Sequence, residues 1–510
     1  MSSTLADVVR QHARHRPDAA AISCGDITLT FSELDRRSSQ VANALAAAGV
    51  GHGDRVAVLD KNSPAFFEVA FGCSKLGAVL VALNWRLAPP EIAAIVSDAK
   101  VSVLLVGEEQ RDVVPADLAV ARTVVMGEDY DQWMGEAEAD DPFTASSADD
   151  VVLQLYSSGT TGRPKGAMLT SGNLAYTFRM ARTAWEMGPE SVNLVPSPLF
   201  HIGGAGYGLT AMSQGGHTVL MRDANPAALL AAVERHRVTH GFLVPAVVNA
   251  LLESPHVAST DLSSLRLIGY GGAPMTESLL LRAINVFGCR FLGVYGMTET
   301  AGTVLVLSPD DHDPGGPRGR LLRGVGKPLP WVELAVKDPV TGEDVGPDAV
   351  GEIWLRSGQN MAGYWNQPET TAQTLIADGW LRTGDGAHRN DEGFVFLDDR
   401  LKDMIISGGE NVYPAEVENV LADHPSVGDV AVIAVPHERW GETVKAFVVL
   451  RPGTRVAADE LVEFARTRLA RYKCPTSVEF VEALPRNASG KVLKQELRVP
   501  YWDKTPPSPA

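Results

Sequence analysis

The fold of this chain is constrained most by short apolar runs that alternate with amphipathic stretches between residues 30 and 270. Residues 30–50 open with Thr-Phe-Ser-Glu-Leu, a helix start signal, and then repeat apolar side chains at helical spacing. The run Arg-Val-Ala-Val-Leu that follows predicts a buried strand. Similar apolar runs stand at 78–83, 191–196, 219–221, 241–244 and 265–269. Strands separated by helices favour a mainly parallel sheet flanked by helices, so the expected fold class is α/β.

The texture of the chain changes twice after residue 320. Residues 332–336 and 351–355 alternate in polarity between turn residues, which predicts a small β-rich subdomain. Beyond 399–403 a self-contained α+β pattern follows, with helices at 414–424 and 458–471 and strands at 428–435, 443–450 and 477–482. A chain of 510 residues is long enough for several domains. We expect a large N-terminal domain over 1–399, a hinge at 400–403, a small mobile C-terminal domain over 404–498 and a disordered tail over 499–510.

Charge and cysteine content exclude some classes of function. The net charge of −17 argues against a nucleic-acid partner, because phosphate binding needs a basic surface. The four cysteines are scattered without metal-ligand spacing, which favours reduced thiols and a cytoplasmic enzyme. We expect no signal peptide and no transmembrane segment, since no uncharged apolar run reaches roughly 20 residues. Peripheral contact with a membrane and a homodimer are left open.

The segment most telling for function is Ser-Ser-Gly-Thr-Thr-Gly-Arg-Pro-Lys-Gly at 157–166. Its glycines let the backbone approach an anion closely, while its hydroxyls and Lys165 supply donors and positive charge. The spacing is not that of the common P-loop, which needs Gly-x-x-x-x-Gly-Lys-Ser/Thr. A surface turn has no need of both the hydroxyls and the lysine, so the segment predicts a triphosphate-binding loop.

Four other segments fit the same chemistry, although each one alone also suits an ordinary turn or loop. Residues 269–274 (Gly-Tyr-Gly-Gly-Ala-Pro) could form a platform for a flat ring. In 295–300 (Tyr-Gly-Met-Thr-Glu-Thr) an aromatic face, a hydroxyl and a carboxylate suit a base, a phosphate and Mg²⁺. Asp385 follows a Gly turn and suits a ribose, with Arg400 as a second contact. Residues 485–491 place Lys491 at the end of a short turn.

Together, in this order and spacing, the five segments resemble the adenylate-forming superfamily, which includes acyl-CoA synthetases and the adenylation domains of peptide synthetases. The resemblance runs from about Phe31 to Arg498, nearly the whole chain, and is nearest to bacterial fatty-acyl-CoA synthetases. The stretch from Asp399 through Glu418 looks like the linker motif of those enzymes, with Lys402 at the hinge position.

The resemblance implies a role for each matching residue. A loop would hold the β- and γ-phosphates: Ser157, Ser158, Gly159, Thr160, Thr161, Gly162 and Lys165. Adenine would be lined by Gly271, Gly272, Ala273, Tyr295 and Gly296, and the ribose held by Asp385 and Arg400. Thr298 would contact the α-phosphate, Glu299 would bind Mg²⁺ and Lys491 would bridge carboxylate and α-phosphate. His201 would lie near the substrate carboxylate, and Gly408 and Gly409 would flank the pantetheine arm of coenzyme A.

The implied reaction is ATP-dependent ligation of a carboxylic acid to CoA, through acyl-AMP and pyrophosphate and then acyl-CoA and AMP. Glycines at 203, 204 and 206 beside His201 leave room for a tail. The further wall candidates are mostly apolar, so an apolar acid fits better than a dicarboxylate or an amino acid: Phe242, Val244, Pro245, Met297, Ala301 and Gly302. The resemblance makes a medium- or long-chain fatty acid the leading substrate. An aryl-acid CoA ligase, an acyl-adenylate donor to a carrier protein and a non-enzymatic nucleotide-binding protein remain alternatives.

The two steps need different surroundings for the same acyl carbon. Lys491 must reach the phosphate in the first step and leave the path of the thiol in the second. A rigid-body turn of the C-terminal domain at Lys402 would withdraw Lys491 and bring Gly408, Gly409 and Glu410 against the active site. Trp440, Lys445 and 471–473 could contact the CoA nucleotide, but solvated surface is the simpler expectation for them.

Overall fold

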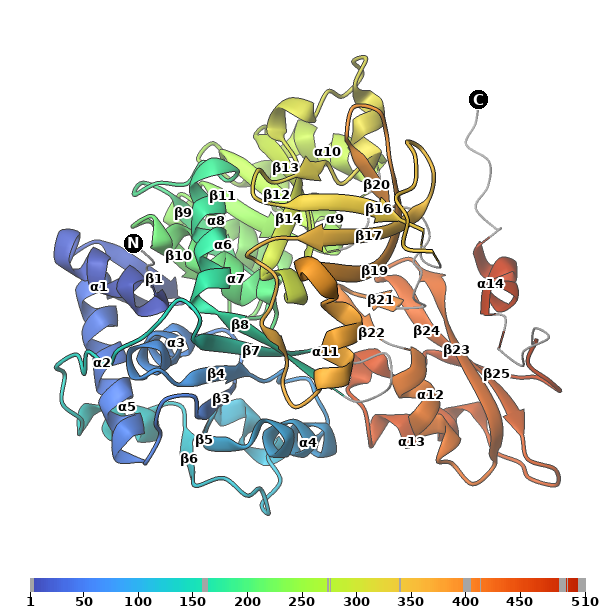
Figure 1. The fold of residues 1–510 in the computed structure, drawn as a ribbon, viewed down its shortest axis with the longest axis horizontal. Coiled ribbons are helices and arrows are strands. Elements are labelled where there is room, and N and C mark those ends of the chain that lie inside the picture. Colours follow the sequence, from blue (N-terminus) through green and yellow to red (C-terminus); the bar gives the residue numbers. More distant parts are fainter. Residues whose placement is uncertain are drawn as a thin grey trace.

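The computed structural model describes residues 4–157, 164–272, 275, 277–338, 341–397, 405–412, 414–485, 492 and 494–502. Its strands form four sheets, of nine, seven, four and five strands. The two largest sheets pack side by side with helices between and outside them, and the C-terminal sheet lies against one end (Figure 1). The expected α/β class is confirmed, with a large N-terminal part and a smaller C-terminal part.

The nine-stranded sheet carries much of the candidate site. Its order is β15-β14-β13-β12-β11-β9-β10-β1-β2, parallel from β13 to β1 and antiparallel at both edges. Its strands are β1 (Ala20–Cys24), β2 (Ile27–Thr30), β9 (Val192–Val195), β10 (His217–Leu220), β11 (His240–Leu243), β12 (Leu267–Gly271), β13 (Arg290–Met297), β14 (Gly302–Leu307) and β15 (Lys327–Pro328).

Helices cover the two faces of this sheet differently. One face packs against α8 (Pro226–His236), α9 (Pro245–Leu252) and α10 (Glu277–Phe287), in an apolar cluster that includes Ile268. The other face, with Leu267, looks into the central core beside α6 (Ser171–Thr183) and α7 (Ile202–Ser213). Adjacent residues of β12 therefore point into different cores, as the period of two in a strand requires.

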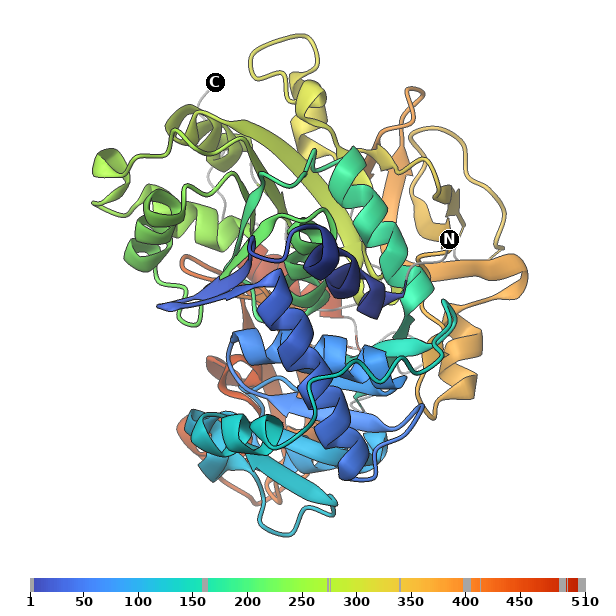
Figure 2. The same cartoon turned by 90° about the vertical axis from the view of Figure 1, so that its left-hand side faces the viewer.

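The seven-stranded sheet has the order β18-β8-β7-β4-β3-β5-β6. Its strands are β3 (Arg55–Leu59), β4 (Val79–Ala82), β5 (Val101–Val106), β6 (Arg122–Val125), β7 (Val151–Ser157), β8 (Lys165–Thr170) and β18 (Gly363–Tyr364). Its helices, shown in blue in Figure 2 with α5 in teal, are α1 (Leu5–His15), α2 (Phe31–Ala47), α3 (Pro64–Leu76), α4 (Pro89–Ala99) and α5 (Glu128–Gly135). The predicted helix at 30–50 is α2. It begins where Thr30 and Glu33 cap each other, since the Thr30 side chain accepts from the Glu33 amide and the Glu33 side chain from the Thr30 amide.

The β-rich region after residue 320 forms the antiparallel sheet β16-β17-β19-β20. Its strands are β16 (Glu333–Lys337), β17 (Gly351–Arg356), β19 (Trp380–Arg389) and β20 (Val395–Leu397), and α11 (Pro368–Thr374) lies in the connection between β18 and β19. This region places Asp385 on β19, facing the end of β13.

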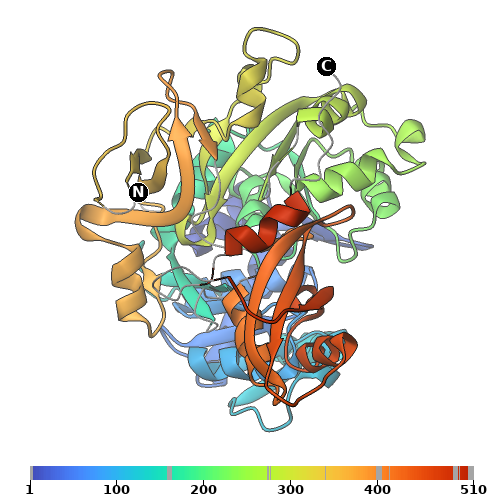
Figure 3. The same cartoon turned by 90° about the vertical axis from the view of Figure 1, so that its right-hand side faces the viewer.

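The C-terminal residues form their own sheet, with the order β22-β21-β24-β23 (Figure 3). Strand β25 also pairs with β24, on the edge away from β23. Its elements are β21 (Ile405–Ser407), β22 (Glu410–Val412), α12 (Pro414–Ala422), β23 (Val427–His437), β24 (Gly441–Leu450), α13 (Ala458–Arg466), β25 (Ser477–Phe480) and α14 (Lys494–Trp502). The order of the predicted elements is correct. The second helix was predicted to reach 471 but ends at Arg466, and a separate 3-10 turn spans Arg471–Lys473.

The predicted start of the disordered tail, residue 499, is too early, because helix α14 continues to Trp502. Residues 499–502 complete helix α14, where the Trp502 indole donates to the Ala434 carbonyl and the Tyr501 hydroxyl donates to Glu479. These contacts hold the last turn of the helix against the sheet. Residues 503–510 lie outside the described part of the chain. Within the described residues, none of the helices is both long enough and apolar enough to cross a membrane.

Candidate active site

The predicted phosphate loop connects two paired strands. Ser157 ends β7 and pairs with Lys165, which begins β8. The loop therefore closes an antiparallel hairpin, and both of its ends are fixed by the seven-stranded sheet. Ser158, Gly159, Thr160, Thr161 and Gly162 lie outside the described residues, as do four other predicted site residues: Ala273, Arg400, Lys402 and Lys491.

The foot of this loop lies beside the predicted magnesium ligand. Strand β18 pairs with β8, so that Tyr364 stands opposite Ala167 and its ring centroid lies 5.2 Å from the Lys165 ammonium. The Tyr364 hydroxyl donates a 2.7 Å hydrogen bond to Glu299 Oε1. Glu299 is 8% exposed and belongs to the 3-10 turn Thr298–Thr300 that follows β13. Lysine, phenol and carboxylate thus converge from three chain segments.

The predicted nucleotide residues also meet. The Tyr295 hydroxyl donates to Asp385 Oδ2 at 2.6 Å, across 90 positions of sequence. Gly271 ends β12, the neighbour of β13, and a Cβ on Gly271 would lie 2.3 Å from the Val294 carbonyl oxygen. Gly296 is equally close to β14, since a Cβ there would lie 2.0 Å from the Gly302 oxygen. These glycines permit the close strand packing that brings the adenine and ribose candidates together.

The Gly408-Gly409 turn of the C-terminal sheet lies against the same region. Both glycines have positive φ, 60° and 86°, in the tight turn between β21 and β22. A Cβ on Gly409 would lie 3.7 Å from Val244 Cγ2, and a Cβ on Gly272 would lie 3.6 Å from Val244 Cγ1. One valine therefore separates the predicted pantetheine turn from the predicted adenine platform.

Glu410 anchors this turn on the N-terminal part of the chain. Its Oε2 lies 2.7 Å from His201 Nε2, and its Oε1 accepts a hydrogen bond from Arg86. Burial opposes ionisation of Glu410, but its contacts with His201 and Arg86 outweigh burial and lower the pKa of the carboxyl group. His201 is the residue that precedes the first turn of α7. Its contact with Glu410 therefore places the predicted acid site next to the C-terminal turn.

Residues 470–473 also fix the same interface. The Asn84 amide donates to the Tyr472 hydroxyl at 2.9 Å, and Lys473 lies 2.9 Å from Glu91 and 2.7 Å from Glu416. Tyr472 packs with Ala470 on the apolar cluster of β3–β5 and α4. The expectation of a solvated surface is therefore wrong for Tyr472 and Lys473. Lys473 is buried and Tyr472 is half-buried because residues 470–473 dock on the N-terminal part.

Sequence analysis missed Tyr364, Arg86 and Glu91. Tyr364 belongs to none of the five segments. It comes next to Lys165 and Glu299 only because β18 pairs with β8. Arg86 and Glu91 precede and begin α4 in a segment with no phosphate-type pattern. An arginine directly after Trp85 in a polar turn was the only signal for Arg86, and that signal is weak.

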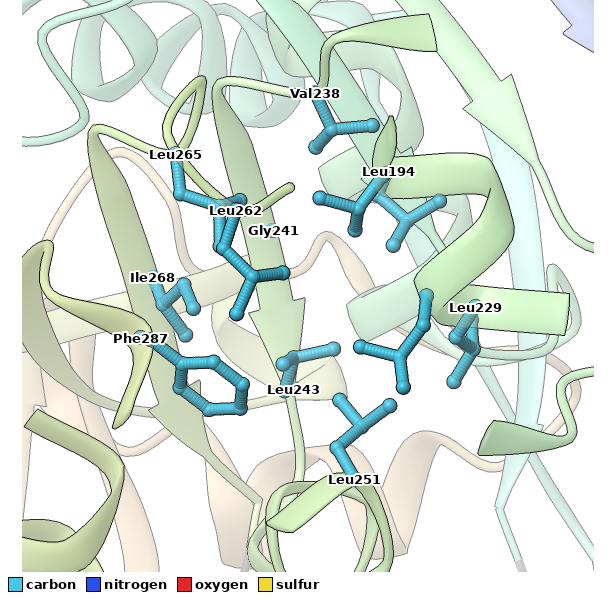
Figure 4. Close-up of a pocket in the computed structure, with 12 residues that line it drawn as sticks. Leu194, Leu229, Val238, Gly241, Leu243, Leu251, Leu262, Leu265, Ile268 and Phe287 are labelled. Atoms are coloured by element: carbon cyan, nitrogen blue, oxygen red, sulfur yellow. The ribbon is translucent and has the colours of Figure 1, made fainter. Parts of the chain in front are cut away.

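A cavity elsewhere in the molecule is not a substrate site. It holds about 20 Å³ and is lined by apolar side chains under α8 and α9, among them Leu229, Leu243 and Phe287 (Figure 4). These side chains belong to the cluster on the outer face of the nine-stranded sheet, whereas Phe200 and Ala205, the neighbours of His201 and Gly203, belong to the central core on the other face. A void this small and without polar partners stays dry.

The donor set fits Mg²⁺ delivered with a nucleotide. The described residues contain no group of three or more histidine, cysteine or acidic side chains able to form a complete metal cage. Magnesium commonly uses one or two carboxylates, substrate phosphates and waters instead. Glu299, oriented by Tyr364 next to Lys165, offers a carboxylate of that kind.

Comparison with known proteins identifies the family. Residues 9–365 match the AMP-binding enzyme family and 416–491 match its C-terminal domain. A feruloyl-CoA synthase of Amycolatopsis is 44% identical over 96% of this chain and 97% of its own. The fatty acid–[acyl-carrier-protein] ligase ScoC of Streptomyces coeruleorubidus is 40% identical over 98% of this chain and 96% of its own.

A solved structure agrees with this result. A double mutant of o-succinylbenzoate CoA synthetase from Bacillus subtilis, bound to a product analogue, superposes with a TM-score of 0.85 at 32% identity, covering 96% of this chain and 97% of its own. The resemblance expected from the five segments is confirmed. The chain belongs to the AMP-binding enzyme family and is an AMP-forming acid–thiol ligase of the acyl-CoA synthetase type, whose reactants are ATP with Mg²⁺, a carboxylic acid and CoA.

Proposed function

We propose that the enzyme activates an apolar carboxylic acid as acyl-AMP at the ends of β12 and β13 and transfers the acyl group to CoA entering past Gly408 and Gly409. The observation that carries the proposal is the position of Val244 between Gly272 and Gly409. A Cβ on either glycine would lie in van der Waals contact with a Val244 methyl group. The predicted adenine platform and the predicted thiol entrance are thereby one side chain apart, as transfer from an adenylate to a thiol requires.

In the first step the acid carboxylate attacks the α-phosphorus, and pyrophosphate leaves. Lys165 at the foot of the loop would hold the β- and γ-phosphates, and Thr298 would donate to the α-phosphate. Mg²⁺ held by Glu299 would offset the charge that develops on the phosphate oxygens. Tyr364 keeps the Glu299 carboxylate oriented. Tyr295 and Asp385 would hold the nucleoside.

In the second step the CoA thiolate attacks the acyl carbon and AMP leaves. The arrangement of Glu410 on His201 and Arg86 fits this step, because it places the Gly408-Gly409 turn on the acid site. We propose that residues 400–403 act as the hinge between a domain over 1–399 and a domain over 404–498. Lys491 would reach the phosphate only when the C-terminal domain turns away from this docked position.

The acid itself is bounded by His201, Gly203 and Phe242. A Cβ on Gly203 would lie 3.1 Å from the Phe242 ring, so this wall is apolar and close. A medium- or long-chain fatty acid stays a prediction from the sequence, and an aryl acid is the alternative that an aromatic wall favours. The similarity to a feruloyl-CoA synthase supports the alternative, and the similarity to a carrier-protein ligase keeps a second thiol acceptor open. The four free cysteines support a cytoplasmic location.

The test is AMP release and thioester formation by the purified enzyme with ATP, Mg²⁺ and a panel of fatty and aryl acids. Parallel reactions would contain CoA or a phosphopantetheinylated carrier protein. We expect acid-dependent AMP release with CoA. Release only with the carrier would replace CoA as the acceptor, and no acid-dependent release with either thiol would overturn the proposal.

A further inference from the structure

On one face of strand β12, the two residues nearest the proposed nucleotide site are glycines and have no side chain. Residues 267, 269 and 271 share the face that looks toward α7, and the last two are glycines. Gly271 leads to the adenine platform. Gly269 lies one step deeper, where its missing side chain leaves bare backbone.

The space beside Gly269 is filled by Trp185. A Cβ on Gly269 would lie 2.0 Å from Trp185 Cη2, so even alanine at 269 would force the indole to move. Trp185 stands just beyond the end of α6 and is 1% exposed. Gly269 and Trp185 are thus complementary in shape, and the indole ends whatever space the glycine face leaves open.

A series of contacts connects this indole to the acid site. His201 and Gly203 lie at the start of α7, and Gly203 faces the ring of Phe242. The Phe242 ring centroid lies 5.6 Å from that of Tyr207 and 6.5 Å from that of Trp185. Tyr207 and Trp185 pack on each other at 4.8 Å. Going inward from His201, the wall is therefore aromatic and is closed by this pair.

The pair carries two polar atoms that have no partner. The Trp185 indole N–H and the Tyr207 hydroxyl are both buried, and neither has a hydrogen-bond partner among the residues that the structure describes. An unsatisfied buried polar group destabilises a protein, so such groups in native proteins call for a ligand, a water or another explanation. Burial raises the pKa of Tyr207 far above its ordinary value, so its hydroxyl stays protonated and can donate.

We propose that Trp185 and Tyr207 close the inner end of the acid pocket and select a compact aromatic acid that carries an oxygen substituent at its far end. This proposal rests on the function proposed above and goes further by naming the substrate class. An acid with an acceptor at this point would pair two donors that an acid without the acceptor leaves unpaired, so the wall favours the former. The closed end also excludes long alkyl tails.

The first experiment measures kcat/KM of CoA-thioester formation for 4-hydroxycinnamate and 4-methylcinnamate, two acids of similar size. We expect the wild-type enzyme to prefer the hydroxylated acid, and Tyr207→Phe to reduce that preference about tenfold. Because Tyr207→Phe removes an unsatisfied hydroxyl and no ring volume, the melting temperature of the free protein should stay the same or rise. A residue with a purely structural role would not alter the ratio between two acids.

The second experiment shortens the indole. Trp185→Ala should raise the kcat/KM ratio of decanoate to hexanoate about tenfold or more, since it opens room for methylenes that the wild type excludes. Trp133→Ala serves as the control, because Trp133 is a buried tryptophan whose ring packs on Tyr130 of the same helix, α5. We expect the control to leave both ratios unchanged.

The possible results separate the two proposals. If no acid gives a CoA thioester, the proposed function fails. If the enzyme is active but Tyr207→Phe changes both cinnamates equally, a buried water satisfies the donors and the substrate assignment is overturned. A wild type that prefers decanoate to both cinnamates would also overturn it. Tyr207→Phe conserves volume and decides the question even if Trp185→Ala does not fold.

Discussion

His201 and Glu410 are 209 positions apart in the chain, and their side chains meet at 2.7 Å. The contact joins the residue before α7, in the proposed acid site, to the first residue of β22, in the C-terminal sheet. Arg86 binds the other oxygen of the same carboxylate. The Glu410 side chain therefore links the proposed acid site to the C-terminal sheet, in the arrangement that we propose for thiol attack.

Replacing Glu410 should slow the second half-reaction selectively. Glu410→Ala leaves Arg86 and His201 without their anion, so the docked position loses stability while the phosphate site is untouched. We expect thioester formation from supplied acyl-AMP to fall about tenfold or more, and acid-dependent ATP–pyrophosphate exchange to stay within about twofold. Glu438→Ala, at an exposed position of the same C-terminal region, is the control. Equal slowing of both half-reactions would remove the assigned role.

Lys491→Ala should have the opposite effect. The family resemblance places this lysine on the α-phosphate in the first step only. We expect acyl-AMP formation to fall roughly 10²- to 10³-fold, the loss commonly seen when one positioned donor is removed. Thioester formation from supplied acyl-AMP should be spared. The two half-reactions, assayed separately, check this, and parallel losses would speak against a lysine that acts only in adenylation.

Lys473 should be required for docking and for stability. It lies between Glu91 of α4 and Glu416 of α12, and its side chain is 5% exposed. Lys473→Met would leave two buried carboxylates without a cation, which costs about 3–5 kcal/mol in comparable sites. We expect a matching drop in the free energy of unfolding in urea, partly recovered by adding Glu416→Gln. Lys445→Met, which breaks a pair within the C-terminal sheet alone, should cost much less. A small effect of both would show that residues 470–473 dock through apolar contacts.

Tyr364→Phe should weaken the binding of magnesium, so that the enzyme needs a higher Mg²⁺ concentration. Without the phenol hydroxyl, Glu299 loses the donor that orients it, while the ring beside Lys165 remains. We expect the Mg²⁺ concentration for half-maximal pyrophosphate exchange to rise about three- to tenfold, in line with the loss of one hydrogen bond to a charged group. Magnesium titrations of exchange at fixed ATP measure the change. A shift in the KM for the acid alone, with an unchanged magnesium curve, would place Tyr364 elsewhere in the mechanism.

His240 should make the enzyme less stable in acid. Burial lowers the pKa of His240 to about 4, below its ordinary value of 6.5, and its ring contacts the Thr239 hydroxyl at 2.7 Å. Between these two values the unfolded chain binds the proton and the folded chain does not, so stability falls as pH falls from 6.5 to 4. The contribution is at most roughly 3 kcal/mol.

Comparison with His240→Gln isolates this contribution, because the other titrating groups remain. The stability advantage of the wild type in urea unfolding should shrink steadily from pH 7 to pH 4. A difference between the two proteins that does not change with pH would mean that His240 has the same pKa in the folded and unfolded states.

Much of this molecule could be predicted from local pattern. The apolar runs at 55–59 and 241–244 form strands β3 and β11. The residue types of Tyr295 and Asp385 predicted a base contact and a ribose contact, and the structure brings the two side chains within hydrogen-bond distance. The strands are encoded by single short runs, whereas the nucleotide segments are specific only in combination.

The failures have a common cause, which is contact between distant segments. Helix α13 ends at Arg466 because Ala470 and Tyr472 must turn toward the N-terminal core, a demand that helical spacing does not reveal. Tyr364 and Trp185 carry no motif, and they matter only through what β8 and Gly269 present to them. Tertiary packing overrides local preference at such positions.

The central claim is that one enzyme makes a mixed anhydride first and a thioester second. In the most direct measurement, the enzyme is incubated without CoA but with ATP, Mg²⁺ and an acid that it accepts as a substrate. One half of the sample is quenched for mass spectrometry, and CoA is added to the other half. The account predicts enzyme-bound acyl-AMP with release of pyrophosphate in the first half, and its conversion to acyl-CoA and AMP in the second. Acyl-CoA formed with no acyl-AMP detectable before CoA is added, or with ADP and phosphate as products, would contradict it.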